Sequence, residues 1–259
     1  MIDFALPPFD FPKPAIIRPA PAELLRYGGD PVAVAVEERQ RRQGLVVGGP
    51  KATAKKKVLA AVATFVDSYI NNSGATTYNF TANLGAGQHC VVVVNSRAVA
   101  ARTISSFTAD GVAGVEGGLA ILNAAACGIC AIYAFAATGA SKTVSIQFSG
   151  SMVRCSIDVF EVENLISTTS TDDAADTSSP LTQSIDCQAG GFIIGGGHSN
   201  STSTSWSWTN LTERSDYPLA SNQRSTAASD NFADAQTGLS ITATASTGAE
   251  QLMALAAYR

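Results

Sequence analysis

The chain has two histidines, His89 and His198, so any histidine-dependent catalysis must use one of them. A serine hydrolase needs a histidine beside a nucleophile and a carboxylate, and the sequence contains no GxSxG segment to supply that nucleophile. His198 lies in the stretch GGGHSN, which favours an exposed, flexible turn. His89 directly precedes an apolar run that is typical of a strand. The histidines therefore predict no catalytic site.

Acidic residues offer two other kinds of chemistry. Glu161 and Glu163 stand two residues apart in an expected strand and share a face, as the acid and base of a glycosidase would, although a solvated sheet face accounts for the same pair. Asp172, Asp173 and Asp176 lie in a Ser/Thr-rich loop and have the oxygen ligands that Ca²⁺ prefers, but they lack the EF-hand spacing. We therefore predict no enzyme activity, no cofactor and no metal site.

Five cysteines occur, and the start MIDF lacks the basic and apolar regions of a signal peptide, so we expect cytosolic synthesis and free thiols. Cys127 and Cys130 have CxxC spacing, but no second CxxC completes a zinc site. In a strand, positions i and i+3 point to opposite faces, which disfavours both a shared metal and a mutual disulfide. The cysteines are predicted to be small buried apolar residues.

Trp206 and Trp208 are two residues apart in a run of serines and threonines, so they share one face of the expected strand. Exposed indoles in this arrangement stack on sugar rings or fill a protein interface. Buried indoles would instead cap the core of the domain. The sequence leaves both interpretations open.

The first 21 residues contain six of the ten prolines of the chain, interleaved with large apolar side chains. Proline fixes φ and removes an amide donor, so this segment is expected to be extended, close to polyproline II. It cannot bury its own apolar groups, and we interpret it as an arm that docks on a partner. The predicted partner-binding residues are Phe4, Phe9, Phe11, Ile16, Ile17 and Arg18.

Residues 1–57 are assigned to this arm, and residues 58–259 to a separate domain. Asp30-Pro31 and Gly44 favour a short helix over 31–43, although alternating valines there also fit a strand. Residues 1–60 hold ten Lys/Arg and six Asp/Glu, a balance of +4, which leaves seven against fifteen, or −8, for the rest. The basic end is too sparse to predict nucleic-acid binding, and it suits a solvated stretch or an acidic protein surface. No run reaches the roughly 18 apolar residues of a membrane span.

Residues 58–259 carry the signals of β structure. Thr143–Ser149 and Leu239–Ser246 alternate apolar and polar residues, whereas Cys90–Val94 and Cys130–Phe135 are apolar throughout and are expected to be covered on both faces. A change of parity near Val159 predicts a β-bulge. About a dozen short strands at regular spacing predict an all-β, two-sheet, jelly-roll-like β-sandwich behind the extended N-terminal arm.

Three segments carry a resemblance, namely SKTVSIQFSGSMVRCSIDVFEVENL, SIDCQAGGFIIGGG and TNLTERSDYPLASNQRSTAASDNFADAQ. Over residues 76–258 the chain resembles structural β-sandwich proteins of tailed bacteriophages. The segment PKPAIIRPA is similar to the extended tails by which virion proteins anchor themselves. The resemblance implies a virion component and supplies no catalytic residues.

The leading hypothesis is accordingly a structural component of a tailed-phage virion, such as a decoration, neck, collar, fibre or tail-associated protein. It would be present in several copies or as a homo-oligomer, with residues 1–57 bound to a capsid, neck or tail protein. It would be made in the host cytoplasm, without nucleic acid or membrane as partners. The alternative is a lectin-like module that binds host-surface glycans through Trp206 and Trp208.

Overall fold

The computed structural model describes residues 58–85, 89–123, 127–136, 140–201, 205–220, 222–247 and 250–259. The contacts divide the chain into two units, and all described residues belong to the second, Lys57–Arg259. The predicted arm with its partner-binding residues, and the predicted helix over 31–43, lie outside the described residues.

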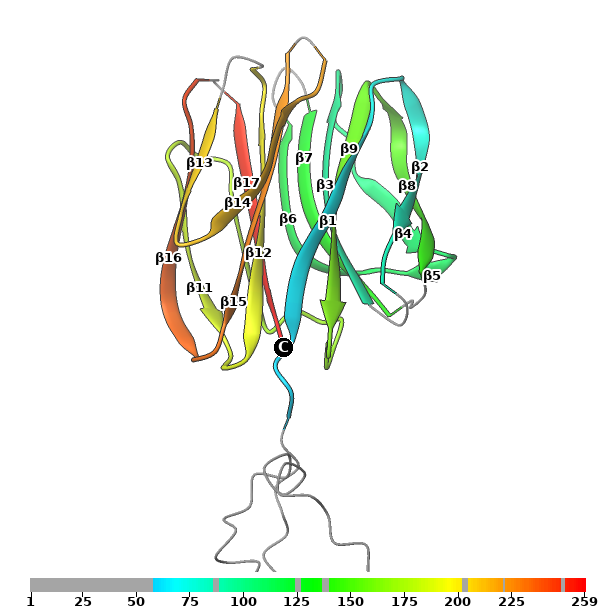
Figure 1. Cartoon of the computed structure of the whole chain (residues 1–259). Helices are drawn as coiled ribbons and strands as arrows, with labels where there is room; N and C mark the ends of the chain where they lie inside the picture. Colours follow the sequence, from blue (N-terminus) through cyan, green and yellow to red (C-terminus); the bar gives the residue numbers. More distant parts are fainter. Residues whose placement is uncertain are drawn as a thin grey trace, which may run out of the picture. The chain divides into compact units, whose positions relative to one another are not determined.

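The described residues form strands throughout (Figure 1). The first nine strands are β1 (Val62–Asn71), β2 (Ala75–Asn83), β3 (His89–Ala98), β4 (Ile104–Ala109), β5 (Val112–Ala113), β6 (Val115–Asn123), β7 (Cys127–Phe135), β8 (Ser141–Met152) and β9 (Arg154–Glu163). The other eight are β10 (Asp172–Asp176), β11 (Leu181–Cys187), β12 (Gly191–Ser199), β13 (Trp206–Thr209), β14 (Thr212–Pro218), β15 (Arg224–Phe232), β16 (Gln236–Ala245) and β17 (Gln251–Tyr258). In this part of the chain there is no helix that is long and apolar enough to cross a membrane.

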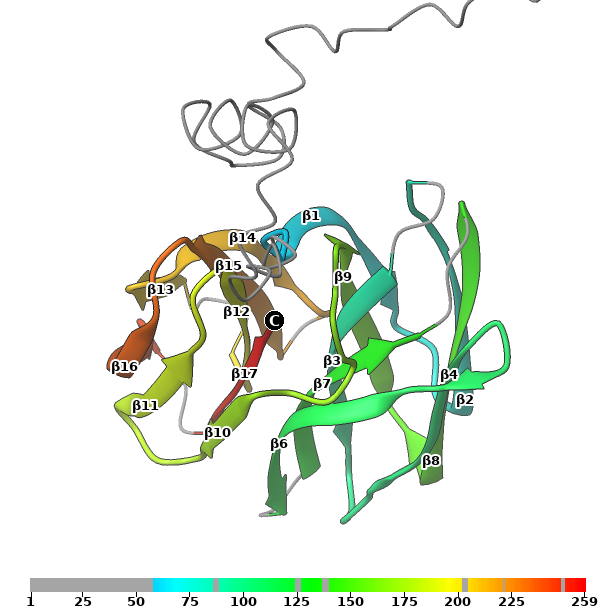
Figure 2. The same ribbon diagram turned by 90° about the horizontal axis from the view of Figure 1, so that it is seen from below.

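The strands pair into four antiparallel sheets that stack as layers (Figure 2). We call them the first outer sheet (β2-β8-β4-β5), the first inner sheet (β1-β9-β3-β7-β6), the second inner sheet (β10-β17-β12-β15-β14) and the second outer sheet (β11-β16-β13). The prediction of an all-β sandwich is confirmed, and the number of sheets is four rather than two.

The two halves of this stack repeat one topology. Strands β1–β9 make the first outer and inner sheets, and β10–β17 make the second pair. When the strands of each half are matched in chain order, with β4 and β5 taken together, both inner sheets and both outer sheets have the same strand order. The central ladders also match, because β3–β7 and β12–β15 each contain nine consecutive pairs and start at Phe135 and Phe232.

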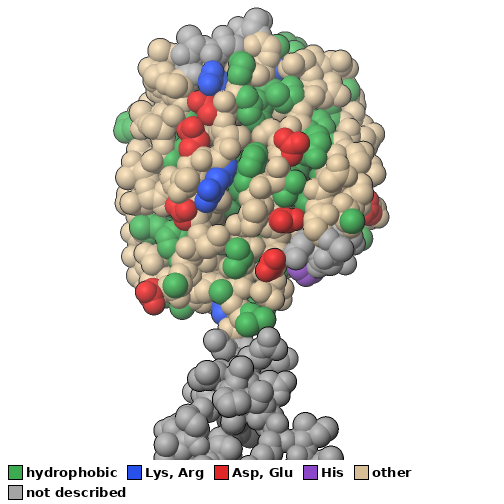
Figure 3. Space-filling model, viewed as in Figure 1, with side chains coloured by type: hydrophobic (Ala, Val, Ile, Leu, Met, Phe, Trp, Pro, Cys, Tyr) green, Lys and Arg blue, Asp and Glu red, His purple; other side chains and the backbone are tan. Residues whose placement is uncertain are grey.

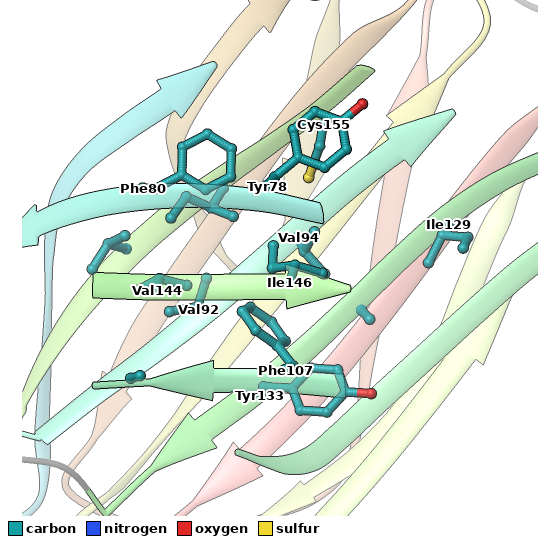
Figure 4. Close-up of a cluster of buried hydrophobic side chains, with 14 of the residues drawn as sticks. Tyr78, Phe80, Val92, Val94, Phe107, Ile129, Tyr133, Val144, Ile146 and Cys155 are labelled. Atoms are coloured by element: carbon teal, nitrogen blue, oxygen red, sulfur yellow. The ribbon is translucent and has the colours of Figure 1, made fainter. Parts of the chain in front are cut away.

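Three apolar cores separate the four layers. In the core between the first outer and first inner sheets, the inward side chains of β8 (Val144, Ile146 and Phe148) meet those of β3, β7 and β9 (Figure 4). Every residue of β7 is buried, because one face of this strand fills that core and the other face fills the core between the inner sheets. Burial on both faces explains the unbroken apolar runs in β3 and β7.

A bulge does lie beside Val159, as predicted, but the extra residue belongs to β1 and not to β9: the β1–β9 ladder shifts register opposite Phe160 and Val159, whereas the β3–β9 ladder is regular. Val159 points into the core below the first outer sheet, and Phe160 points between the inner sheets. Both faces are apolar, so no change of parity is needed. The extra residue in β1 stands between Phe65 and Asp67, the partners of Phe160 and Val159. The expected long loop over 166–180 contains the short strand β10.

Glycines at the centre of β12 set the distance between sheets. A Cβ atom at Gly196 would lie 2.4 Å from Val93 Cγ1 in the first inner sheet. A Cβ atom at Gly195 would lie 2.8 Å from the ring of Trp208 in the second outer sheet. The predicted turn over this glycine run is therefore wrong: the missing side chains allow both neighbouring sheets to approach a central strand.

Candidate functional site

The exposed face of the first outer sheet carries only uncharged polar side chains from its three long strands. Alternation along the strands turns the apolar residues inward and places hydroxyl and amide groups outside. The register aligns them in rows across the strands, for example Asn79, Ser145 and Thr108. The face consists of Thr77, Asn79, Thr81, Asn83, Ser106, Thr108, Ser141, Thr143, Ser145, Gln147 and Ser149.

The second outer sheet has a face of similar chemistry on the opposite side of the stack. The hydroxyls of Thr182 and Thr242 lie 3.0 Å apart on neighbouring strands. The face consists of Thr182, Ser184, Asp186, Ser207, Thr209, Ser240, Thr242 and Thr244, of which Asp186 alone is charged. Neutral polar groups lose less free energy on leaving water than ions do, so both faces suit close contact with another polar surface. The view in Figure 3 likewise shows scattered charged side chains on a mainly uncharged surface.

Trp206 and Trp208 lie on the same side of β13, as predicted, and that side faces the second inner sheet. Trp206 is 5% exposed and belongs to the core between the second inner and second outer sheets. Trp208 is half-buried, and its Nε1 donates to the hydroxyl of Thr226 over 3.1 Å. The rings pack against Gly195 and Gly197. Of the two interpretations from the sequence, the positions of the rings match the one in which the indoles cap the core.

Three of the five carboxylates considered for catalysis or calcium accept hydrogen bonds from backbone amides. Glu161 accepts a hydrogen bond from the amide of Gly85 over 2.8 Å, and Glu163 is exposed at the end of β9. Asp172 accepts the amide of Asp186, and Asp176 accepts the amides of Ser178 and Thr182. In the described ranges no three His, Cys, Asp or Glu side chains are close enough to hold a metal ion.

His198 is buried at 2% exposure in β12, so the predicted exposed turn is wrong. Its Nδ1 lies 2.8 Å from Nε2 of Gln223. Burial, together with the nearby guanidinium groups of Arg97 and Arg154, lowers the pKa of His198 to about 3. The imidazole is therefore neutral near pH 7. His89, the other histidine, is half-buried at the start of β3.

A buried carboxylate that the sequence did not single out joins the two halves. Asp158 of β9 is fully buried between the inner sheets and accepts hydrogen bonds from Ser215 over 2.8 Å and Tyr217 over 3.1 Å, both in β14. Ser68 of β1 donates a third hydrogen bond. Burial raises the pKa of Asp158 to about 6, although the three donors act in the opposite direction. An aspartate in the middle of the apolar run CSIDVFEV was the available signal.

All five cysteines are buried and free, as predicted. Cys127 points into the core below the first outer sheet and Cys130 into the core between the inner sheets. This confirms that the CxxC pair faces in opposite directions. Burial raises the pKa of both Cys90 and Cys130 to about 12, so their thiols stay protonated at neutral pH.

Comparisons with known proteins add no functional assignment. No protein-family model matches the chain. No curated protein and no solved structure gives a significant match either.

Proposed function

We propose that the protein is a structural component of a tailed-phage virion, held on a capsid, neck or tail protein by its N-terminal arm and present in several copies. The observation that carries this proposal is the pair of hydroxyl-rich outer faces on a stack of four sheets, the first without charged side chains and the second with Asp186 alone. Such faces allow close packing between protein subunits with little desolvation of charged groups. We also propose that each half is a jelly roll, since its strands alternate between two facing sheets.

An exposed apolar patch at one end of the stack supports the same role. Val58, Leu59 and Ile166 are 58%, 59% and 60% exposed. Arg259 brings them together, because its Nη1 donates to the carbonyl of Leu59 and its own carbonyl accepts the amide of Ile166. The patch begins directly after the residues assigned to the arm, and it offers a partner an apolar contact there.

The energetics of the arm indicate how it would bind. Burying its five Phe and Ile side chains contributes roughly 7–15 kcal/mol. Ordering about twenty residues costs on the order of 20–40 kcal/mol, which the prolines reduce. Side-chain burial alone is insufficient, so we expect the arm to add main-chain hydrogen bonds to its partner, as in strand addition.

The test is incorporation into particles. Purified virions from cells that produce the full chain should contain it at a fixed copy number by quantitative mass spectrometry. A chain lacking residues 1–57 should fold, as judged by tryptophan fluorescence, and should be lost from the particles. A matched full-length control with Asp234→Asn, an exposed position, should be incorporated normally. Incorporation of the truncated chain at normal occupancy would refute anchoring by the arm.

The second candidate is a lectin-like module for host-surface glycans. The half-buried Trp208 and the neutral polar faces favour it, because sugars bind through stacking and hydroxyl hydrogen bonds. A glycan array that includes bacterial polysaccharides tests it directly. Saturable binding that Trp208→Ala abolishes would support the module, and a blank array would count against it.

A further inference from the structure

Four polar side chains form a compact square on the face of the first inner sheet that meets the second inner sheet. Asn95 and Arg97 lie two residues apart on β3 and therefore share this face. In the adjacent β9, Ser156 is the direct partner of Asn95, and Arg154 is the direct partner of Arg97. The square lies beyond the apolar core, towards the strand ends where β9 begins.

The second inner sheet closes over this square with polar groups of its own. Ser156 lies 3.4 Å, hydroxyl to hydroxyl, from Ser225 of β15. His198 is the direct partner of Ser225 in the sheet and lies against the Gln223 amide. Arg154 reaches across, and its Nη1 donates to the carbonyl of Leu219 over 2.7 Å and to Oδ1 of Asn222 over 2.8 Å.

Several of these buried groups have no hydrogen-bond partner within the protein. Asn95 is fully buried with both amide atoms unpartnered. Arg154 is 7% exposed with Nε unpartnered, and Gln223 is fully buried with Oε1 unpartnered. A buried polar atom left without a partner destabilises the fold, and such atoms rarely cluster unless a ligand or solvent satisfies them.

The same place concentrates positive charge. Arg97 and Arg154 are direct cross-strand neighbours, and like charges in that relation repel each other. Among the described residues, no carboxylate forms an ion pair with either guanidinium. His198 is neutral, and Asp158 stands four residues along β9 from Arg154, where hydroxyl groups bind it. Within the part of the chain that the structure describes, the two arginines therefore have no counter-charge.

We propose that this polar square is a binding site for an oxyanion, either a phosphate or sulfate ion or the carboxylate of a larger ligand. Arg97 and Arg154 supply the charge, and the Asn95 amide donates from the floor of the site. A rotation of the Gln223 side-chain amide by about 180° exchanges the positions of Oε1 and Nε2 and keeps a hydrogen bond to His198. His198 then donates from Nδ1 to Oε1 of Gln223, and the Gln223 NH₂ group joins the donors around the anion.

The partial exposure of Arg97 is consistent with this assignment. Arg97 is half-buried, so its guanidinium connects the interior of the site with solvent. The neighbour of Arg97 on β7 is Gly128, where a Cβ atom would lie 2.6 Å from Cδ1 of Leu252 and 3.3 Å from Nε2 of His198. A side chain at this position would press on Leu252 first and on the imidazole that contacts Gln223 second.

The test uses isothermal titration of the full-length protein at pH 7 and constant ionic strength, with inorganic phosphate, sulfate and glucuronate as separate probes. We expect saturable binding of at least one probe, and Arg97→Gln should weaken it at least tenfold. Arg97→Lys keeps the charge but loses the planar fork, so it should weaken binding by a smaller factor. Arg102→Gln is the matched control, because Arg102 is half-buried and donates to the backbone carbonyls of Ala101 and Ser151.

Tighter binding of phosphate or sulfate than of glucuronate would assign the site to an inorganic oxyanion, and the reverse order would assign it to an acidic sugar. The proposal is overturned if no probe binds saturably to the wild-type chain. It is also overturned if a folded Arg97→Gln variant, checked by circular dichroism, binds as tightly as Arg102→Gln.

Discussion

Two buried groups between the inner sheets should give the protein an unusually flat dependence of stability on pH. Asp158 has a pKa of about 6 in the folded chain against an ordinary value of 3.8. Between these two pH values the folded chain holds more protons than the unfolded chain, so acidification stabilises the fold through this group. The difference, at about 1.4 kcal/mol per pKa unit, amounts to about 3 kcal/mol.

His198 acts in the opposite direction. Its pKa is about 3 in the folded chain against an ordinary value of 6.5. Between these pH values His198 is protonated in the unfolded chain and neutral in the folded chain. Acidification therefore destabilises the fold through His198, with the same slope of about 1.4 kcal/mol per pH unit. Between about pH 4 and pH 6 the contributions of Asp158 and His198 cancel.

Replacing Asp158 by Asn removes the stabilisation on acidification that Asp158 provides and leaves the destabilisation from His198. The free energy of unfolding of the variant should fall by about 2 kcal/mol more than that of the wild type between pH 6 and pH 4, because Asp158 is half-titrated in the folded chain at pH 6. Urea titrations followed by tryptophan fluorescence measure this difference, and the exposed substitution Asp234→Asn serves as the control. If the gap between variant and wild type stays constant within about 0.5 kcal/mol over this range, the reasoning is refuted.

Three further predictions concern the packing. Gly196→Ala should destabilise the protein by about 1–3 kcal/mol in urea titrations, because its Cβ would overlap Val93, whereas Gly74→Ala, with its nearest atom at 3.4 Å, should change stability far less. The five buried thiols should not react with a thiol reagent in the native protein and should all react in urea; fast reaction of a native thiol would contradict their burial. Trp208→Phe should lower stability by about 1 kcal/mol, since it removes the hydrogen bond to Thr226, and an unchanged urea midpoint would show that this bond contributes nothing.

The alternation of polar and apolar residues allowed the orientation of the outer strands to be predicted from the sequence. Burial of the inner strands on both faces removed this alternation, so the number of layers around them could not be predicted. In β8, polar and apolar residues alternate because one face meets solvent, so its orientation follows from the pattern. In β7 and β17 every residue is buried, and a run of this kind does not reveal how many layers cover it. A two-sheet sandwich was therefore predicted where four sheets exist.

The polar groups between the inner sheets were missed for a related reason. They come from segments far apart in the chain, and each one alone is an ordinary polar residue. Asn95 and Ser225 become part of one buried polar cluster only when the two inner sheets stack face to face. The glycines of β12 were misassigned because glycine marks both a turn and a place where neighbouring layers approach closely.

The stacking of four layers fixes the separation of the two outer faces. Adjacent sheets pack about 10 Å apart, so three intervals place these faces about 30 Å from each other, with three apolar cores between them. Two partners that bind opposite faces would be held at a constant spacing by an incompressible block. The faces also differ in detail, since Asp186 belongs to the second and the amides of Asn79 and Gln147 to the first. A single copy would therefore present chemically different faces to two partners bound on its opposite sides.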